Sequence, residues 1–265
     1  MKKTKSLRVA VGMLALTLVT SCFVSGTFAK YVTKATGDGT DLARVAKWGV
    51  EINAGAGDLF KKVYAKDAEG ELTDGKTNLA ITNTVEADVK VVAPGTKNDN
   101  GGFFSLKGQP EVAVNVKIEM TGKDGGAITD VVLPAGTYKD YTGTATEFTI
   151  AEGDDYHPVV FTLKDGATTL KTGTLADIQT YLNGFNKDYA PGTDLSKIFG
   201  NDGTGVYTLA WAWEYGKFDE DTGHDQADTY LGQLIADPTN TEVPTGVTVS
   251  TAFDFVINIT VTQID

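Results

Sequence analysis

Strict alternation of apolar and polar residues marks two long segments of the chain. Residues 111–120 carry an apolar side chain at every second position from Val112 to Met120. Residues 251–264 place five large apolar side chains on one face, namely Phe253, Phe255, Ile257, Ile259 and Val261. Because side chains alternate between the two faces of a strand, both patterns predict half-buried β-strands.

Shorter runs predict further strands, separated by turns rich in glycine, aspartate and asparagine. The candidates are residues 42–52, 85–92, 130–133, 146–150, 158–163 and 206–215. Only one stretch shows the three- and four-residue spacing of a helix, at Leu175, Ile178 and Leu182, with Thr174 as N-cap and Gly184 where the helix should end.

One short helix among about nine strands predicts an all-β fold, an antiparallel β-sandwich with a helical insertion at about 174–184. We expect three regions: a signal peptide over 1–29 whose apolar part is helical, a flexible lead-in over 30–41, and one sandwich domain over 42–265. The chain has 265 residues, a length at which such sandwiches form one domain.

The first 29 residues have the order of a secretory signal peptide. Basic residues at 2–8 precede an apolar run over 9–19, and small residues then lead to Thr27 and Ala29. This order predicts cleavage after Ala29. An uncleaved membrane anchor is the alternative, although the apolar run is shorter than the roughly 20 residues of a spanning helix.

Cys22 is the only cysteine, so the sequence excludes disulfide bonds within one chain. Residues 19–22 also loosely match a bacterial lipobox. In that second interpretation Cys22 carries a lipid and becomes the new N-terminus.

The net charge of −12 disfavours nucleic acid as a partner, because no basic cluster is evident. Removal of the leader leaves 19 basic residues against 35 acidic ones, a net charge of −16. Contact with a membrane is expected only through an uncleaved leader.

No pattern of a known catalytic site is present, and we expect that the protein is not an enzyme. Neither histidine lies in an H-E-x-x-H motif, and the chain has no G-x-S-x-G elbow or P-loop. The densest polar cluster contains Asp219, Asp221, Asp225 and Asp228. It resembles part of a calcium loop, but an acidic solvated loop is the favoured interpretation. We therefore expect no cofactor, with Ca²⁺ as the alternative.

Trp211, Trp213 and Tyr215 lie on one side of a predicted strand. This row is typical either of an exposed carbohydrate-binding ladder or of a buried core. Alternation with Ala212 and Glu214 favours the core.

Several segments resemble one family of Firmicute proteins. The leader end at 25–31 and the segment 43–50 are similar to precursors cut by a eukaryote-like signal peptidase of the SipW type. Residues 93–96, 211–213, 227–232 and 260–265 extend the similarity to the biofilm-matrix proteins of the TasA and camelysin type.

The resemblance implies a secreted jelly-roll protein of the extracellular matrix or cell surface of a Gram-positive bacterium. Its partners would be other copies of itself or related matrix proteins, besides the signal peptidase during export. It also implies that an N-terminal donor segment, here 30 to about 52, completes the sheet of the next subunit. The donor residues expected from it are Tyr31, Val32, Val45, Trp48, Val50 and Ile52. A surface-anchored adhesin or glycan-binding sandwich module is the alternative function, and an exported hydrolase is a more distant one.

Overall fold

The computed structural model describes residues 45–54, 59–60, 63–64, 81–82, 90–140, 146–199, 205–213, 222–236 and 243–264. Several residues singled out above lie outside these ranges: Cys22, Thr27, Ala29, Tyr31, Val32, Tyr215, Asp219 and Asp221. In the part of the chain that the structure describes, no helix is both long and apolar enough to cross a lipid bilayer.

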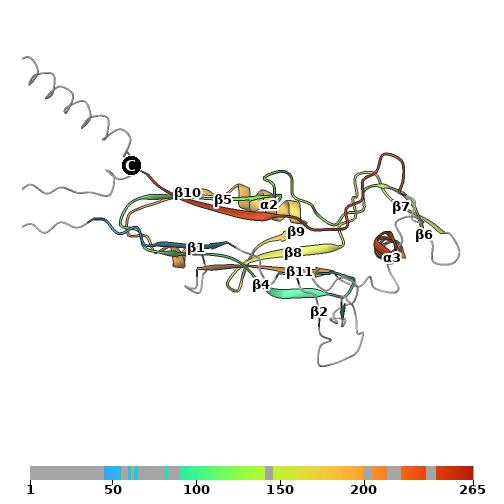
Figure 1. Ribbon diagram of the computed structural model, residues 1–265, viewed down its shortest axis with the longest axis horizontal. Coiled ribbons are helices and arrows are strands. Elements are labelled where there is room, and N and C mark those ends of the chain that lie inside the picture. Colours follow the sequence, from blue (N-terminus) through green and yellow to red (C-terminus); the bar gives the residue numbers. More distant parts are fainter. Residues whose placement is uncertain are drawn as a thin grey trace, which may run out of the picture.

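Two antiparallel sheets form the two layers of the molecule (Figure 1). The larger sheet has the order β1-β4-β11-β8-β9, and the smaller has the order β10-β5-β12. The strands of the larger sheet are β1 (Val50–Ala54), β4 (Lys97–Gly108), β11 (Val206–Trp213), β8 (Val159–Asp165) and β9 (Thr168–Gly173). Those of the smaller sheet are β10 (Asn186–Tyr189), β5 (Val114–Thr121) and β12 (Val256–Gln263). The predicted antiparallel, mainly β character is therefore confirmed.

Two short hairpins lie outside these layers. One pairs β2 (Val63–Tyr64) with β3 (Ile81–Thr82), and the other pairs β6 (Gly136–Asp140) with β7 (Thr146–Ile150). The β6–β7 hairpin packs against helix α3 (Thr222–Ala236) at one end of the molecule (Figure 1). A 3-10 turn, η2 (Leu195–Lys197), packs against β4.

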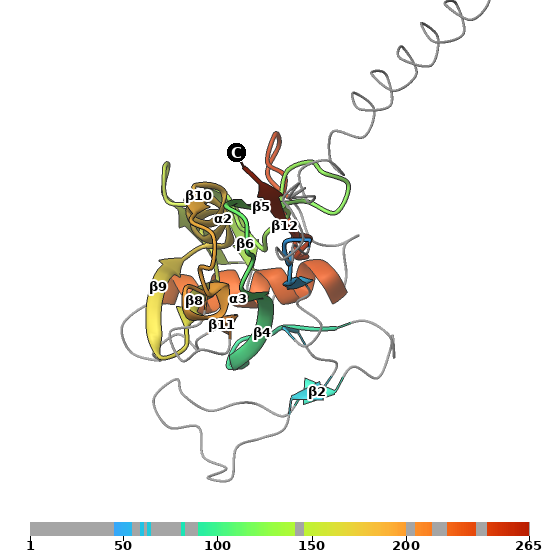
Figure 2. The same cartoon turned by 90° about the vertical axis from the view of Figure 1, so that its left-hand side faces the viewer.

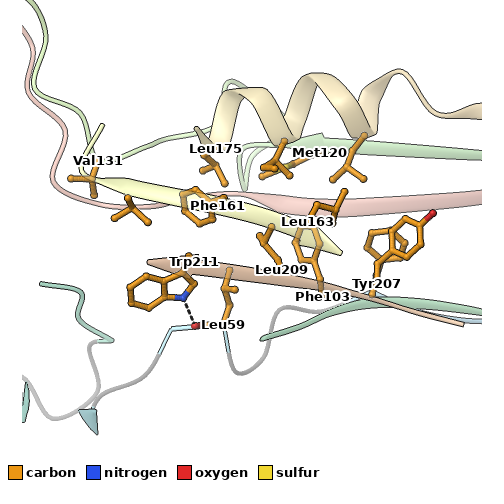
Figure 3. Packing of buried hydrophobic residues seen from close by; sticks show 14 of the residues in the cluster. Leu59, Phe103, Met120, Val131, Phe161, Leu163, Leu175, Tyr207, Leu209 and Trp211 are labelled. Atoms are coloured by element: carbon orange, nitrogen blue, oxygen red, sulfur yellow. Dashed lines mark hydrogen bonds between the residues drawn. The ribbon is translucent and has the colours of Figure 1, made fainter. Parts of the chain in front are cut away.

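The core lies between the two sheets (Figure 3). The alternation predicted over residues 111–120 appears as a strict burial pattern on β5, where every second residue from Val114 to Met120 is fully buried. The facing sheet contributes Phe161 and Leu163 from β8 and Leu209 from β11, all fully buried. Strand periodicity thus places the apolar residues of both sheets in one shared interior.

Helix α2 (Leu175–Asn183) forms where the sequence predicts it. The Thr174 hydroxyl accepts a bond from the Asp177 N–H, the Asp177 carboxylate accepts one from the Thr174 N–H, and Gly184 is the C-cap. Its three predicted apolar residues are all buried, against β5, β8 and β9. The capping residues and the apolar spacing within this segment were therefore sufficient to predict the helix from the sequence.

The structure corrects the prediction of a single helix. Residues 222–236, expected to begin as an acidic loop, form the second helix α3. Its buried face consists of Ala227, Tyr230 and Leu231, and Tyr230 contacts the rings of Tyr138 and Phe148 from the hairpin. The polar first turn conceals the helical spacing in the sequence, and burial against β6 and β7 stabilises the helix.

Candidate functional site

The two long sides of the sandwich are closed differently. On one side α2 lies over β9, β8 and β5, so a helix covers the gap between the sheets (Figure 2). On the other side lie β1 and β12, each the last strand of its sheet; these two strands contact each other, and among the described residues no helix lies between them (Figure 2). Within the described residues, the outer edge of β12 pairs with no strand. We call this side the open seam, formed by β1, β12, residues 59–60 and residues 253–255.

The apolar face of β12 is only partly buried. Ile257, Ile259 and Val261 pair with Met120, Ile118 and Val116 of β5, respectively. The three β5 residues are fully buried, whereas the three β12 residues are half-buried. Each Å² of apolar surface left in water forgoes about 25 cal/mol, so the seam retains a favourable surface for a further strand.

A hollow of about 190 Å³ lies within the seam, lined by Leu59, Phe60, Phe253, Asp254 and Phe255. The rings of Phe60 and Phe253 stack with centroids 5.0 Å apart and an interplanar angle of 14°. Sequence analysis did not single out Leu59 or Phe60, because their neighbours show no periodicity.

The floor of this hollow is fixed by hydrogen bonds from the larger sheet. The Leu59 carbonyl accepts from Trp211 Nε1 at 2.8 Å (Figure 3). It also accepts from Asn98 Nδ2 at 2.9 Å. The Phe60 ring also lies 5.4 Å from that of Trp211. These hydrogen bonds and ring contacts therefore fix the positions of Leu59 and Phe60 in the seam.

The last part of the expected donor segment forms a strand in the structure. Val50 and Ile52 belong to β1 and pair with Gly108 and Leu106 of β4, so residues 50–52 form part of their own subunit's sheet. The donor segment that extends to about residue 52 stays a prediction, because a strand in a single chain can pair only with strands of that same chain.

The residues just before β1 are also attached to the same subunit. Lys47 N–H donates to the Glu111 carboxylate at 2.8 Å, and Glu111 N–H donates to the Lys47 carbonyl at 2.9 Å. Trp48 packs against the core, while Val45 is 56% exposed. Val45, the first residue that the structure describes, therefore lies at the surface of the subunit.

The candidate calcium residues that the structure describes lie on α3. Asp225 is exposed, whereas Asp228 is 7% exposed and its Oδ1 accepts from Tyr156 Oη at 2.7 Å and Trp213 Nε1 at 2.9 Å. These bonds brace the helix against the sandwich. Among the described residues, no group of three or more histidine, cysteine or acidic side chains is arranged to hold a metal ion.

The predicted aromatic row belongs to the core. Trp211 is 2% exposed and Trp213 is 5% exposed, which confirms the core interpretation for these two residues. Their rings are not available as an exposed carbohydrate-binding surface.

Comparison with known proteins gives no relative: no family model, curated protein or solved structure matches this chain.

Proposed function

We propose that the protein is a secreted structural protein of the extracellular matrix or surface of a Gram-positive bacterium, and that copies join through strand addition. The observation that carries the proposal is the open seam, where one edge of β12 pairs with no described strand and adjoins half-buried apolar side chains and a hollow. The resemblance to the TasA and camelysin group, with its jelly-roll fold, is part of this proposal.

Strand addition accounts for both the chemistry and the geometry of the seam. An unpaired strand edge presents backbone N–H and C=O groups that another extended chain can bond, and alternate side chains of that chain enter the apolar gap. When the donor of each copy enters the seam of the next, the contact is head-to-tail and does not close, which generates a filament.

The donor is the segment from Lys30 to about residue 44, released when the leader is cut after Ala29. Fully extended, its 15 residues reach roughly 50 Å, whereas the eight residues of β12 span roughly 26 Å. The segment is therefore long enough to pair along the whole of β12 in a neighbouring copy and still connect to its own β1.

The test compares two versions of the chain, one beginning at Lys30 and one beginning at Val45, by electron microscopy and analytical ultracentrifugation. We expect filaments only from the first. The second retains β1 and should remain a folded single copy with the same thermal unfolding midpoint. A synthetic peptide of residues 30–44 should then bind the shortened chain with one-to-one stoichiometry. Filaments from the version that begins at Val45 would exclude this donor.

A matched pair of variants tests the receiving strand. Ile259→Lys places a charge on the seam face of β12, whereas Thr260→Lys places the same charge on its exposed opposite face. We expect Ile259→Lys alone to stop filament growth, with circular dichroism confirming that both variants are folded. Equal growth by both would refute β12 as the receiving edge.

A further inference from the structure

Three consecutive residues join the segment before β6 to the segment before β8. The Asp155 carboxylate accepts from the Ala135 N–H at 3.0 Å. Tyr156 and Leu133 exchange two backbone hydrogen bonds of 2.9 Å. His157 then reaches the start of the same segment, where its Nδ1 lies 3.1 Å from Asp130 Oδ2. Residues 130–135 are thus fastened at three points.

The fastened segment holds one wall of the open seam. Thr129 and Asp254 exchange two backbone hydrogen bonds, of 2.9 Å from Thr129 N–H and 3.0 Å from Asp254 N–H. Asp254 lies between Phe253 and Phe255, and these three residues line the hollow. Phe253 also contacts the Phe161 ring on β8, four residues after His157. Asp130 adjoins Thr129, whose backbone hydrogen bonds hold Asp254 in the seam wall. A shift of Asp130 would therefore act directly on these hydrogen bonds.

The pair at the centre of this arrangement is sensitive to charge. The Asp130 side chain is 11% exposed, and its Oδ1 is buried and has no hydrogen-bond partner among the described residues. Among the described residues, His157 is the only basic side chain within ion-pair distance of Asp130. A neutral imidazole would leave this carboxylate shielded from water without an opposite charge, which is unfavourable.

In the part of the chain that the structure describes, the charged groups that act on His157 are all acidic. Asp130 faces it from the segment before β6, Asp155 from its own segment, and Asp177 from the first turn of α2. Asp177 is itself paired with Lys171 of β9, at 3.3 Å. The hydrogen bond to Asp130 is the main cause that raises the pKa of His157 above 6.5; burial opposes it, and the charges of the three aspartates add to it.

We propose that His157 and Asp130 form a pH-sensitive latch, which holds residues 129–133 and the adjoining wall of the seam in place while the imidazole is protonated. The contribution of the latch to stability is fully present below the unfolded pKa of His157, about 6.5, and is lost as the pH rises through the higher folded pKa. This inference concerns the folded subunit alone and does not depend on filament formation.

Amide hydrogen exchange of the full chain, read by NMR at Thr129 and Asp254, tests the latch. After correction for the intrinsic pH dependence of exchange, we expect protection at these two amides to fall at least about threefold between about pH 5.5 and about pH 8.5. His157→Gln should show the lower protection at both pH values. His224→Gln, which changes the only other histidine, should behave as the parent chain. Protection in the parent that does not change with pH would overturn the proposal.

A second measurement can overturn the latch with the parent chain alone, so its decisive outcome needs no variant. Titration of the imidazole ring protons by NMR in the parent chain should give His157 a pKa above that of an unperturbed histidine, and Asp130→Asn should lower it. A His157 pKa at or below the ordinary value in the parent chain would also overturn the latch.

Discussion

At the scale of single residues, two tryptophans on β11 satisfy their indole N–H groups in different ways. Trp211 donates to the Leu59 carbonyl, which also accepts from Asn98. Trp213 donates to the carboxylate of Asp228 on α3. A hydrogen bond to a charged acceptor contributes more than one to a neutral carbonyl, and a buried carboxylate deprived of a donor is costly.

The two tryptophans therefore form a natural pair of variants. We expect Trp213→Phe to lower the free energy of unfolding by about 1.5 to 3 kcal/mol beyond its packing loss, and Trp211→Phe by about 0.5 to 1.5 kcal/mol. Denaturant unfolding followed by circular dichroism measures both. Both substitutions remove the same ring atoms from buried sites. A larger loss of unfolding free energy for Trp211→Phe than for Trp213→Phe would therefore contradict the stronger contribution of the hydrogen bond to Asp228.

The sequence predicted the burial of these rings but not their partners. Alternation along β11 is local, whereas Tyr156, the second donor to Asp228, lies 72 residues away from it. The pairing of Asp130 with His157 spans 27 residues for the same reason. Contacts of this kind depend on how the sheets come together, which no spacing within one segment reveals.

At the scale of elements, α2 depends on the reciprocal cap formed by Thr174 and Asp177. We expect Thr174→Ala to lower the free energy of unfolding by about 1 kcal/mol, and Thr174→Ser to retain most of it, because serine supplies the same hydroxyl. Thermal unfolding of the three chains side by side gives the comparison. Equal midpoints for parent and Thr174→Ala would show that the cap contributes nothing.

The stabilisation that this cap provides is lost at acidic pH. The backbone N–H of Thr174, then Lys171, then the Thr174 hydroxyl lower the pKa of Asp177 below 3.8. The stabilisation is therefore complete above the ordinary pKa and is lost as the pH falls through the lower folded pKa. In unfolding experiments at a series of acidic pH values, Asp177→Asn should lose less stability than the parent below about pH 4.

Elements without local signals were missed or misplaced. β4 begins with polar and glycine residues that show no alternation, and it forms because β1 and β11 pair with it on both sides. β12 begins only at Val256, since Phe253 and Phe255 line the hollow instead of continuing the ladder. Residues 130–133 make isolated bridges instead of a regular strand.

The start of β1 depends on one glycine. Gly108 of β4 has a φ of +120°, and a side chain there would overlap the carbonyl of Gly49. Gly125, with a φ of +78°, has nothing within 4 Å and is the matched control. We expect Gly125→Ala to cost about 1 to 2 kcal/mol, and Gly108→Ala to cost about 1 to 3 kcal/mol more.

Amide hydrogen exchange can locate the part of the structure that Gly108→Ala destabilises. Protection should be lost along β1 in Gly108→Ala and retained there in Gly125→Ala. Unchanged protection of β1 in both variants would contradict the close approach of Gly108 to Gly49.

At the scale of the whole molecule, the proposed association must overcome repulsion between acidic copies. Without the leader the net charge is −16, and at about 0.1 M salt such charges are screened beyond roughly 10 Å. We expect the half-time of filament growth, measured by light scattering, to shorten several-fold as salt rises from about 0.02 M to about 0.3 M.

The version that begins at Val45 controls for non-specific precipitation. Its light scattering should stay low at every salt concentration. Growth of the longer version that slows as salt rises would show that attraction between the donor and its receiving site, not repulsion between whole copies, sets the rate.

The attachment of β1 to β4 has a mechanical consequence for a filament built in this way. In such a filament the chain would pass without interruption from the neighbour's seam into β1, whose five residues pair antiparallel with β4. A pulling force along the filament would load this pair in shear, so that all of its rungs resist together instead of opening one after another. The tensile strength of the fibre would then depend on a ladder inside each subunit as well as on the joint between subunits.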